Sequence, residues 1–453
     1  MMRIFFELLE GTVKYFIKTF GCQMNVYDSG RIADILENMG YTAAEQVNDA
    51  DLILFNTCHI REKAAEKLFS DLGRIEIIKN ERAEKGLETT IGVVGCVVQA
   101  EDEQIAKRAP FVDFATGPLT YYRLPEILQR IAHKKGECII DTDFPAESKF
   151  DYLPQNKAKG GCSYLAIQEG CNNFCTYCIV PYTRGVETSR PVEDVINEAK
   201  RLVSTGTLEI NLLGQNVNSY HGEDASGKER SLAYLLNKLA EIDGLQRLRY
   251  TTSYPADVTD ELVDCHRNLK KLMPYLHLPL QSGSDKILKA MNRRHTSGQY
   301  LEIIEKLKDA NPDIGLSSDF IVGFPGETDE DFQATMDMVK KVNYIQAFSF
   351  KYSRRAGTPA AVYPNQVDEK VKKERLEILQ DQLFSQQLRF NKDCVGKIMP
   401  VLFESKGRKN GEIFGRSPYM QTVVVKGDDN NINQIRQVEI IKGGMNSLNG
   451  IIK

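Results

Sequence analysis

Short apolar runs alternate with amphipathic stretches over the first 130 or so residues. Four runs rich in β-branched and aromatic residues predict strands, at residues 14–22, 51–58, 89–96 and 111–117. Helical patterns of period 3.6 lie between them. Buried strands that alternate with helices are typical of a doubly wound parallel sheet. We therefore predict an α/β domain over residues 13–133. The polar stretch rich in Pro and Gly that follows predicts a linker at residues 134–156.

The middle of the chain repeats a strand-then-helix pattern six times. The predicted strands lie at residues 163–171, 208–216, 248–255, 275–281, 315–324 and 344–353. Six such units in about 200 residues fit a partial (β/α)6 barrel better than a full eight-fold one. This barrel domain would span residues 157–388 and end in a long helix. Short strands and turns then fill residues 391–453, which predicts a small antiparallel, OB-like β-barrel of a type that often binds RNA.

Composition narrows the class of protein. Hydrophobic residues make up 42% of the chain and charged residues 26%, as in a globular protein rather than a disordered one. No uninterrupted apolar run is long enough to span a membrane, and the first residues lack the layout of a signal peptide. We expect a cytoplasmic protein without a membrane partner. Residues 386–453 hold 11 Lys and Arg against 6 Asp and Glu, although the whole chain carries −4. The basic tail indicates either a polyanionic partner or simple solubility.

The strongest chemical signal is a cysteine cluster after the first predicted barrel strand. Cys171, Cys175 and Cys178 form a C-x3-C-x2-C motif on one loop. A structural zinc ion would need a fourth ligand close by, and no His or Cys stands at zinc-finger spacing. Three thiolates can instead hold a [4Fe–4S] cubane and leave one iron open for a substrate. The motif therefore predicts an iron–sulfur site.

A second set of cysteines follows the N-terminal strands. Cys22, Cys58 and Cys96 each end one of the first three predicted strands. The carboxyl ends of parallel strands share one edge of the sheet, where ligands bind, so these thiols would converge. They would hold a second cluster with an open iron, unless they are unrelated core cysteines. We interpret the remaining cysteines as packing residues: Cys138, Cys162, Cys265 and Cys394.

Several segments resemble the radical S-adenosylmethionine (SAM) methylthiotransferase family. Residues 19–25, 55–58, 60–64 and 92–96 resemble its N-terminal domain. Residues 169–185, 212–218, 277–284, 318–328 and 357–359 are similar to its radical SAM core. The tail, with residues 415–416 and 447–450, resembles the TRAM RNA-binding domain. Within the family, Gln23, Met24 and Asn25 resemble the branch that acts on isopentenylated adenosine in tRNA.

The resemblance implies roles for further residues. In radical SAM enzymes the aromatic residue before the last cysteine packs near the adenine of SAM, and the second and fifth strands end beside its methionine, adenine and ribose. The candidate SAM-binding residues are Tyr177, Gln215, Asn216, Gln281, Ser282, Gly323, Pro325 and Gly326, of which Gln281 and Ser282 are chosen as barrel-top residues. Turn chemistry alone would also explain the glycines. Candidate partners for phosphate, the SAM carboxylate or RNA are Arg184, Arg190, Arg294 and Arg416, and solvated charge is the alternative for the first three.

The resemblance also implies an activity, the transfer of –SCH3 to C2 of N6-isopentenyladenosine immediately 3′ of the anticodon. C2–H is neither acidic nor electrophilic, so radical chemistry supplied by cofactors is a sensible agent and no side chain is assigned as catalytic. The implied cofactors are two [4Fe–4S] clusters and two SAM per turnover. The implied partners are the anticodon stem-loop of tRNA, an electron donor and an iron–sulfur or sulfur delivery system, with the protein a monomer. Two alternatives stay open: a methylthiotransferase for threonylcarbamoyl-adenosine or a ribosomal protein, and a non-catalytic iron–sulfur protein that binds RNA.

Overall fold

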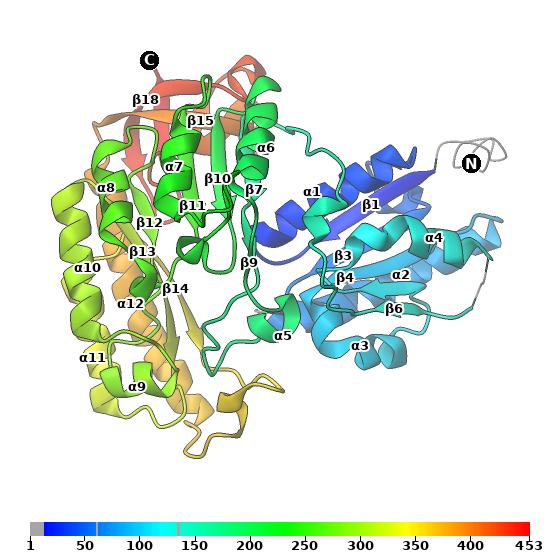
Figure 1. Cartoon of the computed structure of the whole chain (residues 1–453), viewed down its shortest axis with the longest axis horizontal. Helices are drawn as coiled ribbons and strands as arrows, with labels where there is room; N and C mark the ends of the chain where they lie inside the picture. The colour runs from blue at the N-terminus through cyan, green and yellow to red at the C-terminus, as the bar shows by residue number, and fades with distance from the viewer. Residues whose placement is uncertain (1–12, 60–61, 134–135) are drawn as a thin grey trace. The chain divides into compact units, whose positions relative to one another are not determined.

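The computed structural model describes residues 13–59, 62–133 and 136–453 and divides into two compact units (Figure 1). The first unit ends at Lys157 and also includes Ile179–Val186; the second comprises Ala158–Cys178 and Glu187–Lys453. Residues 60 and 61, part of one motif used above, and residues 1–12 lie outside the described residues.

A six-stranded parallel sheet forms the first unit, in the order β2-β1-β3-β4-β5-β6. Its strands are β1 (Lys14–Thr19), β2 (Thr42–Ala43), β3 (Leu52–Thr57), β4 (Thr90–Gly95), β5 (Phe114–Thr116) and β6 (Ile139–Asp141). Its helices are α1 (Gln23–Asn38), α2 (Glu62–Glu84), α3 (Cys96–Arg108) and α4 (Leu124–His133). Alternate residues of β3 enter two apolar clusters, because Ile53 packs with Leu68 of α2 and Leu54 with Ile32 of α1. Both faces are covered, which confirms the predicted doubly wound sheet.

The stretch 134–156 differs from the predicted linker. Strand β6 pairs with β5 and extends the sheet, and the 3₁₀ turn at Lys149–Asp151 buries Lys149 almost completely. The described part of this stretch is therefore folded as part of the first unit rather than extended between two domains. The polar composition on which the prediction rested reflects an edge strand and a buried ion pair.

Six parallel strands make a partial barrel in the second unit and confirm the predicted (β/α)6 architecture (Figure 1). They are β7 (Cys162–Ala166), β10 (Glu209–Leu213), β11 (Arg247–Thr251), β12 (Tyr275–His277), β13 (Gly315–Val322) and β14 (Gln346–Lys351). Their pairing orders are β11-β10-β7 and β12-β13-β14, and a bridge between Leu248 and Leu272 links the two sets. The helices between them are α6 (Val192–Ser204), α7 (Leu232–Ala240), α8 (Asp260–Asn268), α9 (Asp285–Ala290), α10 (Ser297–Ala310) and α11 (Asp329–Val342). A short hairpin of β8 (Gln168–Glu169) and β9 (Thr188–Ser189) flanks α5 (Val180–Arg184) in sequence.

Helix α12 (Glu369–Asp393) leads into a closed five-stranded barrel, which confirms the small β-barrel predicted for the tail. Its strands are β15 (Ile398–Lys406), β16 (Glu412–Arg416), β17 (Thr422–Lys426), β18 (Ile435–Gly443) and β19 (Leu448–Ile452). One pair, β17 with β19, is parallel rather than antiparallel. That pairing closes the barrel and leaves no free edge.

A buried ion cluster fixes this small barrel to the amino ends of β10 and β11. Glu209 accepts hydrogen bonds from Arg249 at 2.9 Å and Arg247 at 3.3 Å. Arg247 also donates to the carbonyl of Pro400 at 2.7 Å, and Arg249 to that of Ser417 at 2.8 Å. In (β/α) barrels the functional residues lie at the carboxyl ends of the strands. The small barrel is attached at the other end, where the strands begin. No helix in the described part of the chain is both long enough and apolar enough to cross a membrane.

Candidate metal centres

The first unit brings three thiols to the carboxyl edge of its sheet. Cys22 caps the N-terminus of α1, Cys58 directly follows β3, and Cys96 begins α3. The strands before them, β1, β3 and β4, are neighbours in the sheet. The thiol of Cys22 hydrogen bonds with that of Cys58, and its charge also acts on Cys96. The cysteines predicted to converge therefore do so in the structure.

Two glycines make room for this approach. Gly21, before Cys22, has φ +125°, and a Cβ there would come within 2.4 Å of the Cβ of Cys58. Gly95, before Cys96, has φ +108°, and a Cβ would come within 2.4 Å of the Thr57 carbonyl oxygen. A side chain at either position would meet both backbone strain and a steric clash. The two glycines let adjacent strand ends carry thiols at close range.

A pair of buried asparagines fixes two of the strand ends. The Oδ1 of Asn25 accepts from the backbone N–H of Cys22 at 3.3 Å. Its Nδ2 donates to Asn56 Oδ1 at 3.0 Å and to the Thr57 carbonyl at 3.2 Å, while Asn56 donates back to the Asn25 carbonyl at 2.9 Å. Both side chains are at most 1% exposed. This closed set of hydrogen bonds holds the start of α1 against the end of β3.

The electrostatic setting of the thiols differs along the edge. The hydrogen bond from Cys58 lowers the pKa of Cys22 to about 6, against burial, and the positive charge of Arg184 contributes. Burial raises the pKa of Cys96, and a hydrogen bond and the charge of Arg184 partly oppose it. Thiolates, not thiols, bind metal, so the nearby cation favours the ligating form.

The thiols are not arranged around a single ion. Within residues 13–59, 62–133 and 136–453, no three His, Cys, Asp or Glu side chains form a group that could hold one metal ion. A single zinc ion needs its ligands about 2.3 Å from one point. In a cubane, each thiolate binds a different iron, so the thiolates stand further apart. Three thiols at neighbouring strand ends are a donor set that fits a [4Fe–4S] cluster with one open iron.

The second unit holds the other triad on the loop after β8. Gly170 and Phe174 adopt positive φ angles, +77° and +45°, which wind the loop tightly. The side-chain amide of Asn173 donates to the sulfur of Cys171 at 3.5 Å, and Arg293 donates to that of Cys175 at 3.8 Å. Hydrogen bonds to cysteine sulfurs are among the levers that tune iron–sulfur clusters.

Residues 290–293 secure that loop from the side. The carbonyls of Ala290 and Met291 accept hydrogen bonds from Thr176, at 2.9 and 3.1 Å. Asn292 donates to the carbonyls of residues 173 and 174, at 3.2 and 3.1 Å. Sequence reasoning missed Arg293 and this segment. The signal available was an Asn-Arg-Arg run after the fourth predicted strand, of which only Arg294 was selected.

Polar side chains gather at the carboxyl ends of the barrel strands, and Gln215 contacts the loop. Gln215 Oε1 accepts from the N–H of Gly170 at 2.6 Å, and Gln168 Oε1 accepts from the N–H groups of Gln215 and Asn216 at 3.0 and 3.1 Å. Asn216 Oδ1 and Gln281 Oε1 are buried and find no hydrogen-bond partner among the described residues. Gln281 also has a positive φ of 75°. Two unmatched buried acceptors fit a ligand with ammonium or hydroxyl donors, such as SAM. Gln168 was not foreseen from the sequence.

Tyr177 and the turn after β13 lie together. The ring of Tyr177 packs against the apolar cluster that contains Phe324, between Gly323 and Pro325. Gly323 and Gly326 have φ +70° and +82°, so the turn requires glycine at both positions. A Cβ at Gly323 would also come within 2.3 Å of Lys372 on α12. Ser282 is fully buried, and its hydroxyl accepts from the N–H of Ser284 at 3.2 Å.

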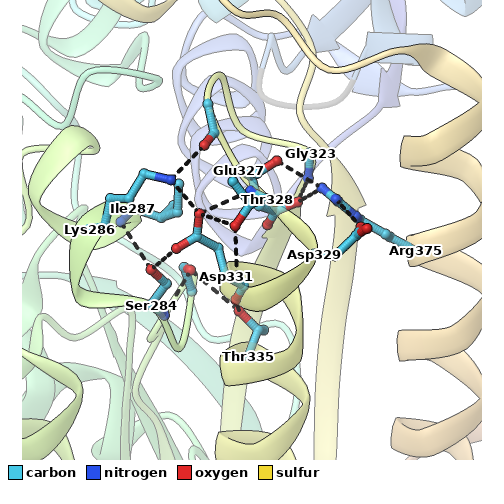
Figure 2. A network of polar contacts seen from close by, with 12 residues as sticks. Ser284, Lys286, Ile287, Gly323, Glu327, Thr328, Asp329, Asp331, Thr335 and Arg375 are labelled. Carbon is cyan, nitrogen blue, oxygen red and sulfur yellow. Dashed lines mark hydrogen bonds and ion pairs between the residues drawn. The ribbon is translucent and has the colours of Figure 1, made fainter.

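An ion-pair network holds this turn in place, as Figure 2 shows. The Glu327 carboxylate accepts from the N–H of Gly323 at 2.6 Å and from Arg375 of α12 at 2.7 Å. Asp331, at the start of α11, accepts from Ser284 and Lys286, both at 2.6 Å. The turn is thereby connected to α9, α11 and α12. These contacts fix the backbone of the turn at residues 323–326.

The four candidate arginines all have partners within the protein. Arg184 pairs with Asp28 at 2.7 Å, and Arg190 pairs with Glu198 at 2.7 Å and donates to the Ala166 carbonyl. Arg416 donates to Thr422 at 2.8 Å within the small barrel. Arg294 donates to Asn173 on the cysteine loop at 2.7 Å, and its side chain is 59% exposed. Of the four, Arg294 lies beside the second triad and is open to solvent.

Comparison with known families covers most of the chain. Residues 165–339 match the radical SAM superfamily, residues 14–117 the uncharacterized protein family UPF0004, and residues 392–453 the TRAM domain. Among solved structures, the radical SAM methyltransferase TsrM from Kitasatospora setae superposes with a TM-score of 0.56 over 78% of this chain and 77% of its own, at 12% identity. The cobalamin-dependent SAM radical enzyme OxsB does so with a TM-score of 0.53 over 83% of this chain and 57% of its own, at 13% identity. At such identities the likeness concerns the fold.

A closer relative comes from Agrobacterium fabrum. Its tRNA-2-methylthio-N(6)-dimethylallyladenosine synthase is 55% identical over 440 residues, 96% of this chain and 96% of its own. The relative therefore spans both cysteine triads, the partial barrel and the small barrel. The chain belongs to the family of tRNA-2-methylthio-N(6)-dimethylallyladenosine synthases, radical SAM proteins with a C-terminal TRAM domain.

Proposed function

We propose that this protein is a tRNA methylthiotransferase, which adds a methylthio group to C2 of N6-dimethylallyladenosine next to the anticodon. The observation that carries the proposal is the presence of two cysteine triads, one at the carboxyl edge of the parallel sheet and one on the loop after β8, each in its own unit. One triad suits a radical generator, and the other suits a second cluster with an open iron. The 55% identical relative bears the name of this activity.

The cofactors are two [4Fe–4S] clusters and SAM, and when bound they supply the radical and the methylthio group. The protein's residues hold and orient them. Cys22, Cys58 and Cys96 are the proposed ligands of one cluster, and Cys171, Cys175 and Cys178 those of the other. Asn216 and Gln281 offer the buried acceptors that a SAM molecule would satisfy. Tyr177 and the turn at residues 323–326 form the surface for its adenosine.

Binding of the tRNA is assigned to the TRAM barrel together with the open end of the partial barrel. Two loops of the small barrel, residues 406–412 and 427–430, line a hollow. Its lining includes the acidic Glu412, Asp428 and Asp429, of which Asp429 pairs with Lys406 at 2.6 Å, and the basic side chains of Lys406, Arg408 and Lys409. Side chains of this kind contact phosphates, and such contacts position an RNA without reading its sequence. The target adenine must leave its stack in the anticodon loop to reach the barrel top.

Further partners follow from the chemistry. Reductive cleavage of SAM needs an electron donor, and repeated methylthio transfer consumes sulfur that a delivery system must replace. We place the enzyme in the cytoplasm, where its tRNA substrate is.

Nucleoside mass spectrometry tests the proposal. A bacterial strain without its own methylthiotransferase for this position is complemented with this chain, and bulk tRNA is digested. We expect the mass of 2-methylthio-N6-dimethylallyladenosine to appear and the unmodified N6-dimethylallyladenosine to fall. The Cys171→Ala/Cys175→Ala/Cys178→Ala variant serves as the matched control and should restore nothing.

Three readouts separate the alternatives. Methylthiolated threonylcarbamoyl-adenosine, or a mass shift on a ribosomal protein, would identify another substrate of the same chemistry. A protein that binds tRNA but forms no 5′-deoxyadenosine with SAM and reductant would be a non-catalytic RNA-binding protein, which contradicts the proposal.

A further inference from the structure

Arg184 occupies an unusual place for a residue of the radical SAM segment. It ends α5, and the surrounding stretch Ile179–Val186 packs as part of the first unit rather than the second. The residue is only 4% exposed. Its guanidinium donates to Asp28 Oδ2 at 2.7 Å. An arginine from six positions beyond Cys178 is thus buried among the elements that carry the other three cysteines.

Asp28 contacts two further side chains besides Arg184. Lys149 lies 3.3 Å from its other carboxylate oxygen, and Tyr121 donates to that oxygen at 3.2 Å. Although burial opposes ionisation, the charges of Lys149 and Arg184 hold the pKa of Asp28 below its usual range. Asp28 therefore joins Lys149 and Arg184 in one set of charged side chains, all nearly fully buried.

Arg184 also acts on the thiols of the first unit. Arg184 hydrogen bonds with the side chain of Cys96, and its charge also favours the thiolate of Cys22. A cubane held by three thiolates is itself net negative. Reduction makes it more negative by one electron, so a fixed cation beside it stabilises the reduced form. A guanidinium keeps its charge at all accessible pH values and offers a rigid set of donors.

We propose that Arg184, oriented by Asp28, is the positioning residue that sets the reduction potential and retention of the cluster held by Cys22, Cys58 and Cys96. This inference rests on the proposed function, because it assumes a cluster at that triad. Arg184 then acts on the cluster of the first unit and not on the SAM carboxylate or the RNA.

The test isolates the first cluster in the full-length chain. In a Cys171→Ala/Cys175→Ala/Cys178→Ala background, the protein is reconstituted anaerobically, and its midpoint potential is measured by redox titration followed by electron paramagnetic resonance. In Arg184→Gln, the equilibrium constant for reduction should fall about tenfold, which is about 59 mV for one electron. Arg184→Lys keeps the charge and should recover most of the shift.

A matched control comes from the same unit. Arg31 is also 4% exposed and pairs with an aspartate, Asp34, at 2.8 Å. Its partners among the described residues are Asp34 and the carbonyl of Pro154, not the three cysteines, so Arg31→Gln should lose a similar ion pair without moving the potential. A shift in Arg31→Gln equal to that in Arg184→Gln would reduce the effect to general damage and overturn the proposal.

A second variant, in which the expected shift of the midpoint potential has the opposite sign, tests the proposal if Arg184→Gln retains no cluster. Asp28→Asn keeps a side-chain oxygen that can accept from Arg184 but removes a negative charge from the same place, so it should raise the midpoint potential. An unchanged or lower potential in Asp28→Asn, or an unchanged one in iron-loaded Arg184→Gln, would overturn the role of Arg184. Failure of the proposed function is a separate result, since it shows in the nucleosides formed by the parent enzyme and not in this potential.

Discussion

At the scale of single side chains, Asn25 joins two of the three strand ends that carry thiols in the first unit. Replacing it with Ala removes the acceptor for Cys22 and leaves the side-chain oxygen of Asn56 without its donor. A buried polar group left unpaired costs about 1–3 kcal/mol. We expect the apoprotein to lose that much stability in urea denaturation. The reconstituted protein should lose iron from the first site only.

The control for this change is Asn80→Ala on the exposed face of α2. It removes the same amide without a buried partner and should leave both stability and iron content near the parent values. Full iron loading of the Asn25→Ala variant would show that the asparagine pair does not position Cys22.

His266 gives the folded protein a pH dependence that is independent of the metal centres. Burial lowers the pKa of His266 to about 4, and its Nε2 lies 2.6 Å from the hydroxyl of Tyr250. In the unfolded chain a histidine takes up a proton near pH 6.5, but the folded one does not until the pH is much lower. Its contribution is therefore complete above pH 6.5 and is lost as the pH falls toward 4, by about 3 kcal/mol in all.

Urea denaturation between pH 4 and 7 measures this effect as a difference between variants. The stability of His266→Gln should fall less steeply with decreasing pH than that of the parent. Parallel slopes for parent and His266→Gln would contradict the prediction.

At the scale of elements, α12 supports the turn on which the SAM nucleoside is proposed to rest. Arg375→Met would leave Glu327 buried without its cation. Breaking one side of a buried ion pair costs about 3–5 kcal/mol. We expect a loss of that order in thermal or urea denaturation. SAM should also bind more weakly in equilibrium dialysis, because Glu327 holds the N–H of Gly323.

Lys370→Met on the same helix is the matched control, since the Lys370 side chain is 83% exposed. A surface ion pair contributes little, so its stability should stay within about 0.5 kcal/mol of the parent value. Unaltered SAM affinity in a folded Arg375→Met protein would show that the ion-pair network does not support SAM binding.

Element types and their order followed from the sequence because they depend on local patterns. Strand β3 is buried along its whole length, so it reads as one apolar run, and the cysteines after β1, β3 and β4 come together because parallel strands share an edge. Local patterns do not predict which distant segments pair with one another. Nothing local in residues 139–141 distinguishes an edge strand from a linker. Likewise, Arg184 meets Asp28, 156 positions away, only once the chain has folded.

At the scale of the whole molecule, the binding of tRNA should depend on the charge of the small barrel. Changing Lys406, Arg408 and Lys409 to Gln should weaken the affinity for tRNA and flatten its dependence on salt, because fewer counterions are released. Filter binding between about 50 and 200 mM salt measures both. Cleavage of SAM without tRNA should remain at the parent rate.

This set of substitutions is preferable to removal of the tail. The small barrel supplies the carbonyls to which Arg247 and Arg249 donate, so a truncated chain would expose buried arginines at the base of the partial barrel. A loss of tRNA affinity in the truncated protein would have two causes that cannot be separated, the missing charge and misfolding. Affinity and salt dependence that stay unchanged in the Gln variant would place the RNA contacts elsewhere.

The two units have separate apolar cores, one set around the six-stranded sheet and the other around the partial barrel. Each triad should therefore be removable without loss of the other. Reconstituted protein should contain about eight irons if both clusters are cubanes, and about four after either triad is changed to alanine. Iron analysis with Mössbauer spectroscopy checks these values.

The proposed roles of the two triads are also separate. The Cys22→Ala/Cys58→Ala/Cys96→Ala variant keeps the triad at Cys171, Cys175 and Cys178, so it should still cleave SAM to 5′-deoxyadenosine. It should form no methylthiolated nucleoside, because the proposed site of the transferred sulfur is gone. If the first triad were only core packing, the alanines would cost stability but leave product formation in whatever protein stays folded. Methylthiolated adenosine from the folded variant would therefore assign the sulfur to another site, whereas 5′-deoxyadenosine without that product places the two halves of the reaction in different units.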